Sequence, residues 1–445
     1  MNTPVCDFVR KYSKDNTLRM HMPGHKGKSI LGFEPFDITE IKGADSLYEA
    51  DGIIRESEEN ASALFGCQTF YSTEGSSQCI RAMLYLAMLD AKSKGKKAVI
   101  AAGRNAHKTF LYAAAMLDFE IQWIYPDEDE AYLSCKIDEK KLKKLFDSDS
   151  EKPTALYLTT PDYLGNITDI KAISEICRNN GIILLVDNAH GSYLKFLPES
   201  IHPIDLGADI CCDSAHKTLP VITGGAYLHI SKNAPSYIPS QAKNALSLFG
   251  STSPSYLILQ SLDYANRIIS DGYKEKLEET VENVKKIKAA LIKYGYSLSG
   301  DEPLKITIQT KDFGYYGYEI ADILESKKIF VEFSDPDYTV LMISVQTDNA
   351  ELKKLEDALF TIPRKNEIKH SPPPFSVCQK IISVREAVMS ESETVSVSEC
   401  EGRILATPSV ACPPAVPIVI CGEKINSDSL KLFEYYGIRK CDVIK

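Results

Sequence analysis

Short apolar runs of strand length recur along the middle of the chain, between about residues 54 and 230. Five stand out: AVIAA (98–102), ALYLT (155–159), IILLVD (182–187), ADICCD (208–213) and GAYLHI (225–230). Runs without a polar face are typical of strands that are covered on both sides, as in a mostly parallel sheet.

Segments with helical periodicity lie between these runs. In residues 76–92 the apolar side chains fall on one stripe, formed by Cys79, Ile80, Met83, Leu84, Ala87 and Met88. Such a stripe predicts an amphipathic helix that packs against a sheet. The alternation of helix and strand predicts one large α/β domain, with helices flanking its sheet.

The flanking sequence predicts further parts. The first segment is rich in Gly, His and Pro and has no clear period, which indicates an arm rather than a domain. Three consecutive prolines within 365–377 indicate a linker, because proline is excluded from helix interiors and central strands. We expect an arm at 1–54, the large domain at 55–295, a small α/β domain at 296–364 and a C-terminal domain at 375–445.

Composition narrows the class of protein. With 445 residues, 44% of them hydrophobic, the chain has the composition of a globular protein. Its 61 acidic and 51 basic residues give a net charge of −10, which does not favour a nucleic-acid partner. No run approaches the roughly 18 apolar residues of a membrane span. The first 20 residues lack the apolar core of a secretory signal, and the cysteines are scattered without a CxxC pair, so we expect a cytoplasmic protein.

Polar residues follow two of the apolar runs at the point where each ends. Asp187 closes IILLVD, with His190 three residues later, and Ser214, His216 and Lys217 follow ADICCD. The carboxyl ends of parallel strands meet at one edge of a sheet, where ligands bind. A lysine that is desolvated there can become a nucleophile.

Two other segments add to this edge. Gly75, Ser76 and Ser77 stand at the start of the amphipathic helix, and a helix N-terminus with hydroxyl groups suits a phosphate. His107, in RNAHKT after AVIAA, supplies a planar imidazole. A nucleophilic lysine, a carboxylate, a phosphate site and a flat ring together fit pyridoxal 5′-phosphate, whose ring nitrogen needs a nearby negative charge.

Each piece also has an ordinary interpretation. Ser76 and Ser77 are typical helix-capping residues, and an Asp at a strand end is a common turn former. Asp187 and His190 are possible metal ligands, but no third and fourth ligand follow at a recognisable spacing, so we expect no metal. The case for a cofactor depends on the conjunction of all these residues at strand ends of one domain.

The motifs also resemble those of a known family. They are RMHMPGHKGK (19–28), DITEIKGADSLYEADGII (37–54), FYSTEGSSQ (70–78), RNAHKT (104–109), TTPDYLGNITDI (159–170), VDNAHG (186–191), DSAHKTLPVITGG (213–225) and EGRILATPSVACPPAVPIVICGEKI (401–425). In this order they resemble the Orn/Lys/Arg decarboxylases, which are fold type I pyridoxal-phosphate enzymes, in the short bacterial form without an N-terminal wing domain. The resemblance covers nearly the whole chain.

The resemblance implies a role for each residue. Lys217 would bond covalently to the cofactor aldehyde, Asp187 would pair with the ring nitrogen and His107 would stack on the ring. His190 would lie beside the cofactor. The phosphate would be held by Gly75, Ser76, Ser77, Ser214 and His216, and the catalytic residues would be Lys217, His216 and Asp187.

The chain departs from the family pattern at a few positions. Glu74 stands where relatives usually have Asn, and Ser76 replaces Thr. CPPAVP replaces a Tyr-Pro-Pro-Gly-like run, and Cys421 stands where Pro is common. None of these changes removes a chemical group that the cofactor needs.

The implied reaction is decarboxylation of a basic L-amino acid. Arginine, which yields agmatine, is the first choice, lysine and ornithine are alternatives, and the product would feed polyamine synthesis. Glu49, Asp51 and Glu74 are candidate carboxylates for the distal cation of the substrate. The short form and its arm, with His21, His25 and Lys26, also suggest a homodimer or higher oligomer whose arm reaches across a subunit interface.

Two other functions stay open at this point. Another fold type I reaction, such as that of an aminotransferase or a lyase, would use the same Lys, Asp and phosphate site. Arg364 is the only Arg between residues 297 and 380, which weakens transamination, because transaminases generally clamp the substrate carboxylate with an Arg of the small domain. A non-catalytic relative that binds the cofactor is the other alternative, and retention of Lys217, Asp187 and His107 argues against it.

Overall fold

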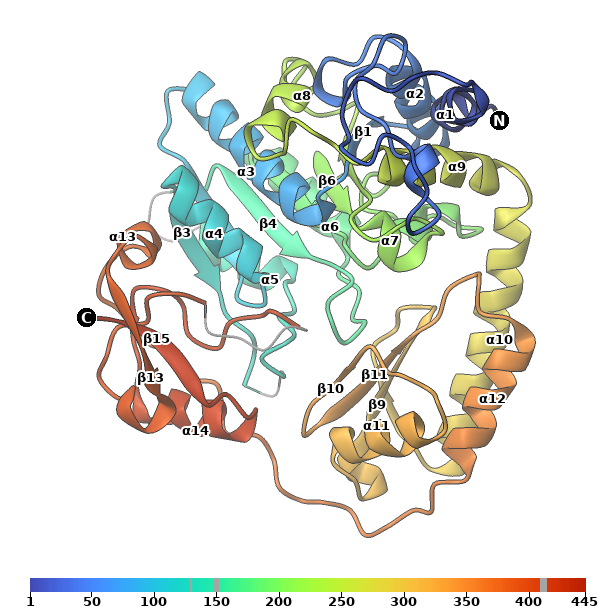
Figure 1. Ribbon diagram of the computed structural model, residues 1–445. Coiled ribbons are helices and arrows are strands. Elements are labelled where there is room, and N and C mark those ends of the chain that lie inside the picture. The colour runs from blue at the N-terminus through green and yellow to red at the C-terminus, as the bar shows by residue number, and fades with distance from the viewer. Residues whose placement is uncertain (129, 147–151, 409–413) are drawn as a thin grey trace. The chain divides into compact units, whose positions relative to one another are not determined.

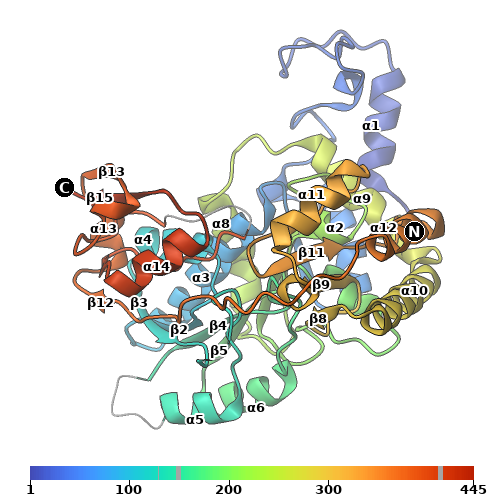
Figure 2. The same cartoon turned by 90° about the horizontal axis from the view of Figure 1, so that it is seen from below.

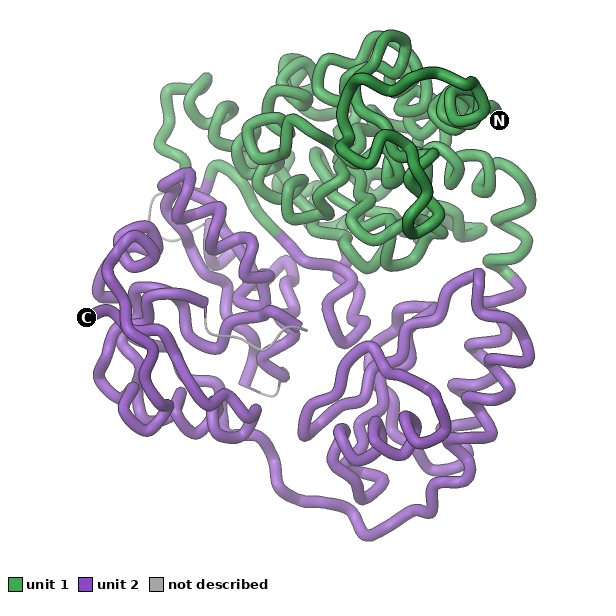
Figure 3. The backbone as a smooth tube through the Cα atoms, in the orientation of Figure 1, with its two compact units in different colours: residues 1–98, 154–157, 170–278 green, residues 99–153, 158–169, 279–445 purple. Residues whose placement is uncertain are grey.

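The computed structural model of the chain describes residues 1–128, 130–146, 152–408 and 414–445. These residues form two compact units (Figure 3). The first contains Met1–Ala98, Thr154–Tyr157 and Ile170–Glu278, and the second contains Val99–Pro153, Leu158–Asp169 and Glu279–Lys445. Cys412 and Pro413, which begin the CPPAVP segment, lie outside the described residues.

Seven strands form the largest sheet, in the order β1-β7-β6-β5-β4-β2-β3 (Figure 1). Their bounds are β1 Gln68–Ser72, β2 Val99–Gly103, β3 Glu120–Ile124, β4 Ala155–Thr159, β5 Ile183–Asp187, β6 Ile210–Asp213 and β7 Ala226–Ile230. β2 pairs parallel with β3 and β5 with β6, whereas β7 is antiparallel to β1 and β6. The predicted α/β class with a mostly parallel sheet is confirmed. The five apolar runs correspond to β2, β4, β5, β6 and β7, and every residue of β2, β5, β6 and β7 is buried.

The two strands at the ends of this order, β1 and β3, did not stand out in the sequence. Their sequences, QTFYS and EIQWI, mix polar and apolar residues, and both strands are partly exposed. An edge strand has a neighbour on one side only, so it does not need the continuous apolar run of a central strand.

The helices of the first unit surround its strands. They are α1 Pro4–Lys14, α2 Ile53–Phe65, α3 Gly75–Ser93, α6 Ile170–Asn180, α7 Ala215–Thr218, α8 Ile238–Leu248 and α9 Tyr256–Ser270. α3 is the predicted amphipathic helix, and Cys79, Ile80, Met83 and Leu84 of its stripe are fully buried or nearly so. Helix α10 Tyr273–Tyr294 begins in the first unit and ends in the second.

The N-terminal arm is more regular than its composition predicts. It begins with α1, where Pro4 occupies the first turn and Val5 and Val9 are fully buried. Proline suits the first turn of a helix because its missing N–H has no partner there in any case. The apolar side chains of α1 repeat over only three helical turns, so their helical periodicity is not evident in the sequence. From residue 15 to 52 the arm has only the short 3₁₀ turns Glu34–Phe36 and Leu47–Glu49.

The second unit holds a smaller antiparallel sheet with strand order β10-β11-β9-β8. Its strands are β8 Ser297–Ser299, β9 Lys305–Gln309, β10 Phe333–Ser334 and β11 Tyr338–Met342, accompanied by helices α11 Gly317–Ser326 and α12 Asn349–Phe360. α4 Lys108–Leu117 and α5 Glu139–Phe146 also belong to this unit. After β8, the elements follow in the order β9, α11, β10, β11, α12.

The C-terminal residues of the second unit fold around a small core of their own. The elements are β12 Gln379–Lys380, α13 Val384–Val388, β13 Ser392–Ser396, β14 Glu423–Lys424, α14 Ser427–Tyr435 and β15 Lys440–Ile444. Helices α13 and α14 and strands β13 and β15 gather in this part of the chain (Figure 2). Phe433 of α14 packs with Leu405 and with Val443 of β15, and all three are fully buried. The proline-containing segment 365–377 has neither helix nor strand. Among the described helices, none has both the length and the apolar character that crossing a bilayer requires.

Candidate active site

Neighbouring parallel strands of the first unit present Asp187 and Lys217. Asp187 is the last residue of β5 and lies opposite Cys212 of β6. After β6, Ser214 leads into the short helix α7, which carries His216 and Lys217. The sequence-predicted residues at these two strand ends therefore lie on one edge of the sheet.

Lys217 is in direct contact with His190. Its Nζ atom lies 2.9 Å from His190 Nε2, within hydrogen-bond distance. His190 is buried, whereas Lys217 keeps part of its surface exposed. The contact with the imidazole fixes the position of the lysine amine, and its partial exposure lets a small molecule reach it.

Asp187 is a buried carboxylate with several donors. Tyr157 Oη, on β4, donates to Oδ2 at 3.0 Å, and the backbone N–H of Ala189 donates to Oδ1 at 3.2 Å. The Cys212 thiol lies 3.7 Å from Oδ1. Burial raises the pKa of Asp187, and the charge of Lys217 and these hydrogen bonds oppose the rise. Such a carboxylate favours a further positive partner.

The start of α3 forms a cradle of hydroxyl groups. Gly75 begins the helix with φ +72°, in the left-handed region, and no atom lies within 4 Å of the place where a Cβ would stand. The Ser214 hydroxyl donates to Ser76 Oγ at 2.8 Å, which brings the loop after β6 to the same N-terminus. Ser77 follows in the first turn. Free backbone N–H groups and hydroxyls at a helix N-terminus suit a phosphate.

His216 has a fixed tautomer. Its Nδ1 lies 3.0 Å from the carbonyl oxygen of Gly225, which only accepts, so Nδ1 carries the hydrogen and Nε2 is left for other partners. Burial lowers the pKa of His216. The ring is therefore mainly neutral near pH 7, and Nε2 is the atom at which it takes up a proton.

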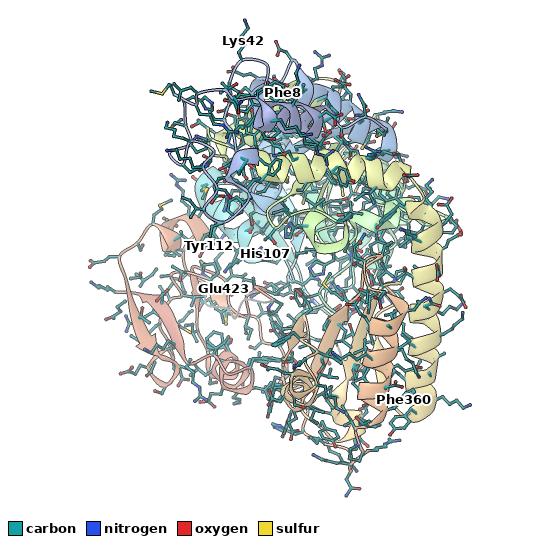
Figure 4. The ribbon with its side chains drawn as sticks, turned by 45° about the vertical axis from the view of Figure 1, so that its right-hand side comes forward. Phe8, Lys42, His107, Tyr112, Phe360 and Glu423 are labelled. Carbon is teal, nitrogen blue, oxygen red and sulfur yellow. The ribbon has the colours of Figure 1, made fainter. Side chains whose placement is uncertain are left out.

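His107 belongs to the second unit, where it is the N-cap of α4 (Figure 4). Its Nδ1 accepts the backbone N–H of Thr109 at 3.2 Å and lies 2.9 Å from Thr109 Oγ1. These bonds fix the plane of the imidazole relative to the helix.

The three carboxylates that were candidates for the distal cation of a substrate differ in their surroundings. Glu49 and Asp51 are exposed. Glu74 is the N-cap residue of α3, and its carboxylate accepts the backbone N–H of Ser251. That bond occupies Glu74 with the protein's own backbone.

Several neighbours of the site did not stand out in the sequence. Tyr157 and Cys212 lie inside apolar runs, where nothing in the pattern marks the side chain that faces Asp187. Asp213, next to Cys212, accepts hydrogen bonds from His202 Nε2 at 3.1 Å and His229 Nε2 at 3.2 Å. Ligand atoms of His202, Cys211 and Asp213 lie within 4.8 Å of one another, a grouping that local spacing does not reveal.

The donor set of the first unit fits pyridoxal phosphate. The hydroxyls at the start of α3 suit its phosphate, and the open space beside Gly75 leaves room for a close approach. Asp187 offers a buried negative charge for the ring nitrogen, and Lys217 offers an amine for the aldehyde.

The fold is that of fold type I pyridoxal-phosphate enzymes. The structure matches the lysine decarboxylase LdcF of Francisella novicida with a TM-score of 0.79, over 100% of this chain and 81% of that chain. The two sequences are 18% identical, so this match concerns the fold.

Sequence comparison identifies the family within this class. The family model described as Orn/Lys/Arg decarboxylase, major domain, matches residues 3–298, and the model of the C-terminal domain matches residues 369–440. The chain is 29% identical to YaaO of Bacillus subtilis (strain 168), with 97% of this chain and 93% of the relative covered. It is 28% identical to arginine decarboxylase of the same organism, with 96% and 92% covered. The chain belongs to the Orn/Lys/Arg decarboxylase family, and it is a carboxy-lyase that uses pyridoxal 5′-phosphate.

Proposed function

We propose that the protein decarboxylates L-arginine to agmatine, with lysine and ornithine as the alternative substrates, and that the product feeds polyamine synthesis. The arginine decarboxylases of Bacillus subtilis and Bacillus anthracis, which each align with 96% of the chain, support this order of preference. The observation that carries the proposal is the half-buried Lys217 amine at 2.9 Å from His190, one strand away from the buried Asp187.

The residues of the first unit divide the work of binding. Lys217 Nζ would bond to the cofactor aldehyde, and Asp187 would hold a negative charge near the ring nitrogen. Gly75, Ser76, Ser77, Ser214 and His216 would bind the phosphate, and His190 would orient Lys217. The stacking role of His107, which belongs to the second unit, stays a prediction. When bound, pyridoxal phosphate supplies an electron sink for the electron pair that is released when the bond between the substrate Cα and its carboxylate breaks.

Lys217 and His216 are the groups placed to return a proton to the substrate Cα. Lys217 Nζ would donate this proton, and His190 Nε2, which lies 2.9 Å from it, would exchange a proton with it. His216 acts through Nε2, because its Nδ1–H is held by Gly225. Its lowered pKa favours a neutral ring that takes up a proton and gives it back.

The arm supports a homodimer or a higher homo-oligomer. Leu18, Met20, Ile30 and Leu31 are each between 75% and 81% exposed, far more than such apolar side chains usually are. A second copy of the chain covering this arm would bury them. The described cysteines are buried and none of them forms a disulfide bond, which supports a cytoplasmic location.

The predicted division into parts also stands as a proposal. We propose an arm at 1–54, a large domain at 55–295 and a C-terminal domain at 375–445. The major-domain match, residues 3–298, spans the first two parts together, and the second match covers residues 369–440. The small domain at 296–364 contains the antiparallel sheet β10-β11-β9-β8.

The test is an assay of the purified protein with arginine, lysine and ornithine, in which CO₂ release and the amine product are both measured. Lys217→Ala should abolish turnover, because no amine remains to bond to the aldehyde, and should leave the fold intact. Borohydride reduction of the wild-type protein should fix a pyridoxyl label on the peptide that contains Lys217. Lys232→Ala, which changes an exposed lysine of the same unit, is the matched control and should keep both activity and label.

Unchanged turnover in Lys217→Ala, or a label on another peptide, would disprove the site. Release of an amine from lysine or ornithine but not from arginine would correct the substrate and keep the site. Keto-acid formation without CO₂ would favour the aminotransferase alternative.

A further inference from the structure

The second unit contains a cavity walled by aromatic side chains. Its volume is about 230 Å³, and it lies among the residues around β10, the start of α11, and the end of α14. We call it the tyrosine pocket. Its walls include Tyr132, Tyr318, Phe333, Tyr435, Tyr436 and the carboxylate residue Asp335.

The rings stand at different angles around this space. Tyr132 and Tyr436 have centroids 4.5 Å apart at an interplanar angle of 52°, and Tyr435 meets Tyr436 edge to face at 4.9 Å. Electron-rich ring faces attract cations, and rings that enclose a cavity from several directions suit a cationic group that carries apolar carbon.

Asp335 gives this pocket an unpaired acceptor. It is 8% exposed, and its Oδ1 accepts the backbone N–H groups of Asp337 and Tyr338, each at 2.7 Å. Its Oδ2 is buried and has no hydrogen-bond partner among the described residues. A buried carboxylate oxygen without a donor is unfavourable unless a ligand supplies one.

Lys311, a lysine that reaches the Tyr435 hydroxyl, is already engaged by other groups of the protein. Lys311 Nζ pairs with Asp337 at 2.6 Å, donates to the carbonyl oxygen of His370 at 2.6 Å and contacts the Tyr435 hydroxyl. Tyr435 and Tyr436 donate their hydroxyls to Asp337 as well. The two neighbouring carboxylates therefore differ: Asp337 is satisfied by the protein, and Asp335 is not.

We propose that the tyrosine pocket binds a small organic cation, an alkylammonium or guanidinium group, which donates to Asp335 Oδ2 and packs its carbon chain against the tyrosine rings. The residues of the pocket carry this inference, and only the choice of agmatine and arginine as probes rests on the proposed function. The same chemistry is present in a free amine, such as agmatine, and in a basic amino acid. The amine without a carboxylate suits the pocket better, because Asp335 and Asp337 would repel a second negative group.

The pKa of Asp335 agrees with this interpretation. Burial raises it to about 7, and the negative charge of Asp337 adds to the effect. A bound cation would stabilise the ionised carboxylate and lower that pKa again.

The test is calorimetric titration of the full-length Lys217→Ala protein, which does not consume arginine, with agmatine, with arginine, and with the neutral analogue butylurea. We expect agmatine to bind and butylurea not to bind. Asp335→Asn should weaken agmatine binding at least tenfold, while its amide oxygen can still accept the two backbone N–H groups. Since the readout is binding by a catalytically inactive protein, failure of the proposed reaction and failure of this inference are separate results.

A second variant guards against a folding effect. Tyr318 lines the pocket and is 46% exposed, so Tyr318→Leu should fold and should weaken agmatine binding severalfold. Tyr264→Leu, which changes a tyrosine of α9 that is 40% exposed and does not line the pocket, should not. Tighter binding of arginine than of agmatine would identify the amino acid as the ligand. The inference would be overturned if agmatine bound equally well to the proteins with Asp335 and with Asn at this position. It would also be overturned if butylurea bound as tightly as agmatine, or if neither agmatine nor arginine bound.

Discussion

Asp213 in the first unit and Asp335 in the second are both buried carboxylates, yet they behave in opposite ways. Asp213 is fully buried, and Asp335 is 8% exposed. Burial by itself would raise the pKa of both. The imidazoles of His202 and His229, which face Asp213 and bond to it, instead hold its pKa well below the usual range. The pKa of Asp335 rises to about 7.

The difference comes from the donors that the protein itself provides. Both oxygens of Asp213 are used: Asn188 Nδ2 donates to Oδ1 at 2.7 Å, and the two imidazoles donate to Oδ2 at 3.1 and 3.2 Å. At Asp335 both donors converge on Oδ1, and Oδ2 has none. A carboxylate that the protein satisfies completely supports the fold, whereas one that is left open can bind an external cation.

Asp187 lies between these two cases. Tyr157, Ala189 and Cys212 all approach it, yet burial still raises its pKa. Hydrogen bonds from neutral donors compensate only in part for the loss of water around a charge. A carboxylate with this balance is suited to a cationic partner that arrives from outside, such as a protonated ring nitrogen.

The largest effect is expected at Asp187. Asp187→Ala removes the charge that favours a protonated ring, so the decarboxylation rate should fall by about 10²–10³-fold. Rates are measured by CO₂ release at saturating cofactor, and cofactor content is measured by absorbance. Asp187→Asn, which keeps the shape but not the charge, should lose a comparable amount of activity. Full activity in either variant would refute the electrostatic role.

The next largest effect is a loss of stability at Asp213. Asp213→Asn removes a charge to which two buried imidazoles and an amide donate, so the free energy of unfolding should fall by about 3 kcal/mol, as is typical when one partner of a buried charged network is lost. Urea denaturation followed by circular dichroism measures it. A loss below about 1 kcal/mol would show that the network contributes little.

Replacement of Asp335 should raise the free energy of unfolding, and only at higher pH. Its pKa is raised in the folded protein, so between about pH 4 and 7 the unfolded chain releases this proton first and the folded state loses stability as the pH rises. Asp335→Asn avoids that loss and should raise the free energy of unfolding by about 2 kcal/mol at pH 8, with little change at pH 4. The variant keeps the other titratable groups around this position, which are Asp337, Lys311 and the pocket tyrosines, so the difference between the two proteins reports on Asp335. Denaturation curves at the two pH values check the prediction, and equal effects at both would contradict it.

The smallest effect is expected at Tyr157. Tyr157→Phe removes one donor to Asp187, which raises the pKa of that carboxylate further and should weaken pyridoxal-phosphate binding about fivefold, the equivalent of one hydrogen bond. Fluorescence titration of the apoprotein measures the affinity. Tyr227→Phe is the matched control: Tyr227 is fully buried on β7, and its hydroxyl has no partner among the described residues, so its loss should leave cofactor affinity unchanged.

Prediction from sequence succeeded where one local pattern carries the information. Strands β2, β4, β5, β6 and β7 each coincide with a short, mainly apolar run, and such a run can be recognised without knowledge of the neighbouring strands. β1 and β3 were missed because an edge strand is partly exposed and reads as mixed sequence. Helix α1 was missed because its apolar stripe is short and the proline-rich and glycine-rich residues that follow it obscure the period.

The same reasoning applies to the candidate site. Asp187 and Lys217 could be found because each follows the end of an apolar strand, and parallel pairing makes those ends meet. Tyr157 could not be found, because it looks like any other residue of a buried run until its neighbour on the sheet is known. The tyrosine pocket draws on residues as far apart as Tyr132 and Tyr436, and no local pattern joins them.

The sequence alone determined the α/β class, the family and the side chains available for cofactor chemistry, because periodicity and short motifs are properties of consecutive residues. Tertiary structure alone decided which buried carboxylates are satisfied and which are left open. The reason is physical: the pKa and the free energy of a buried charge depend on groups a few ångströms away in space. The donors to Asp213 and the walls around Asp335 come from distant parts of the chain.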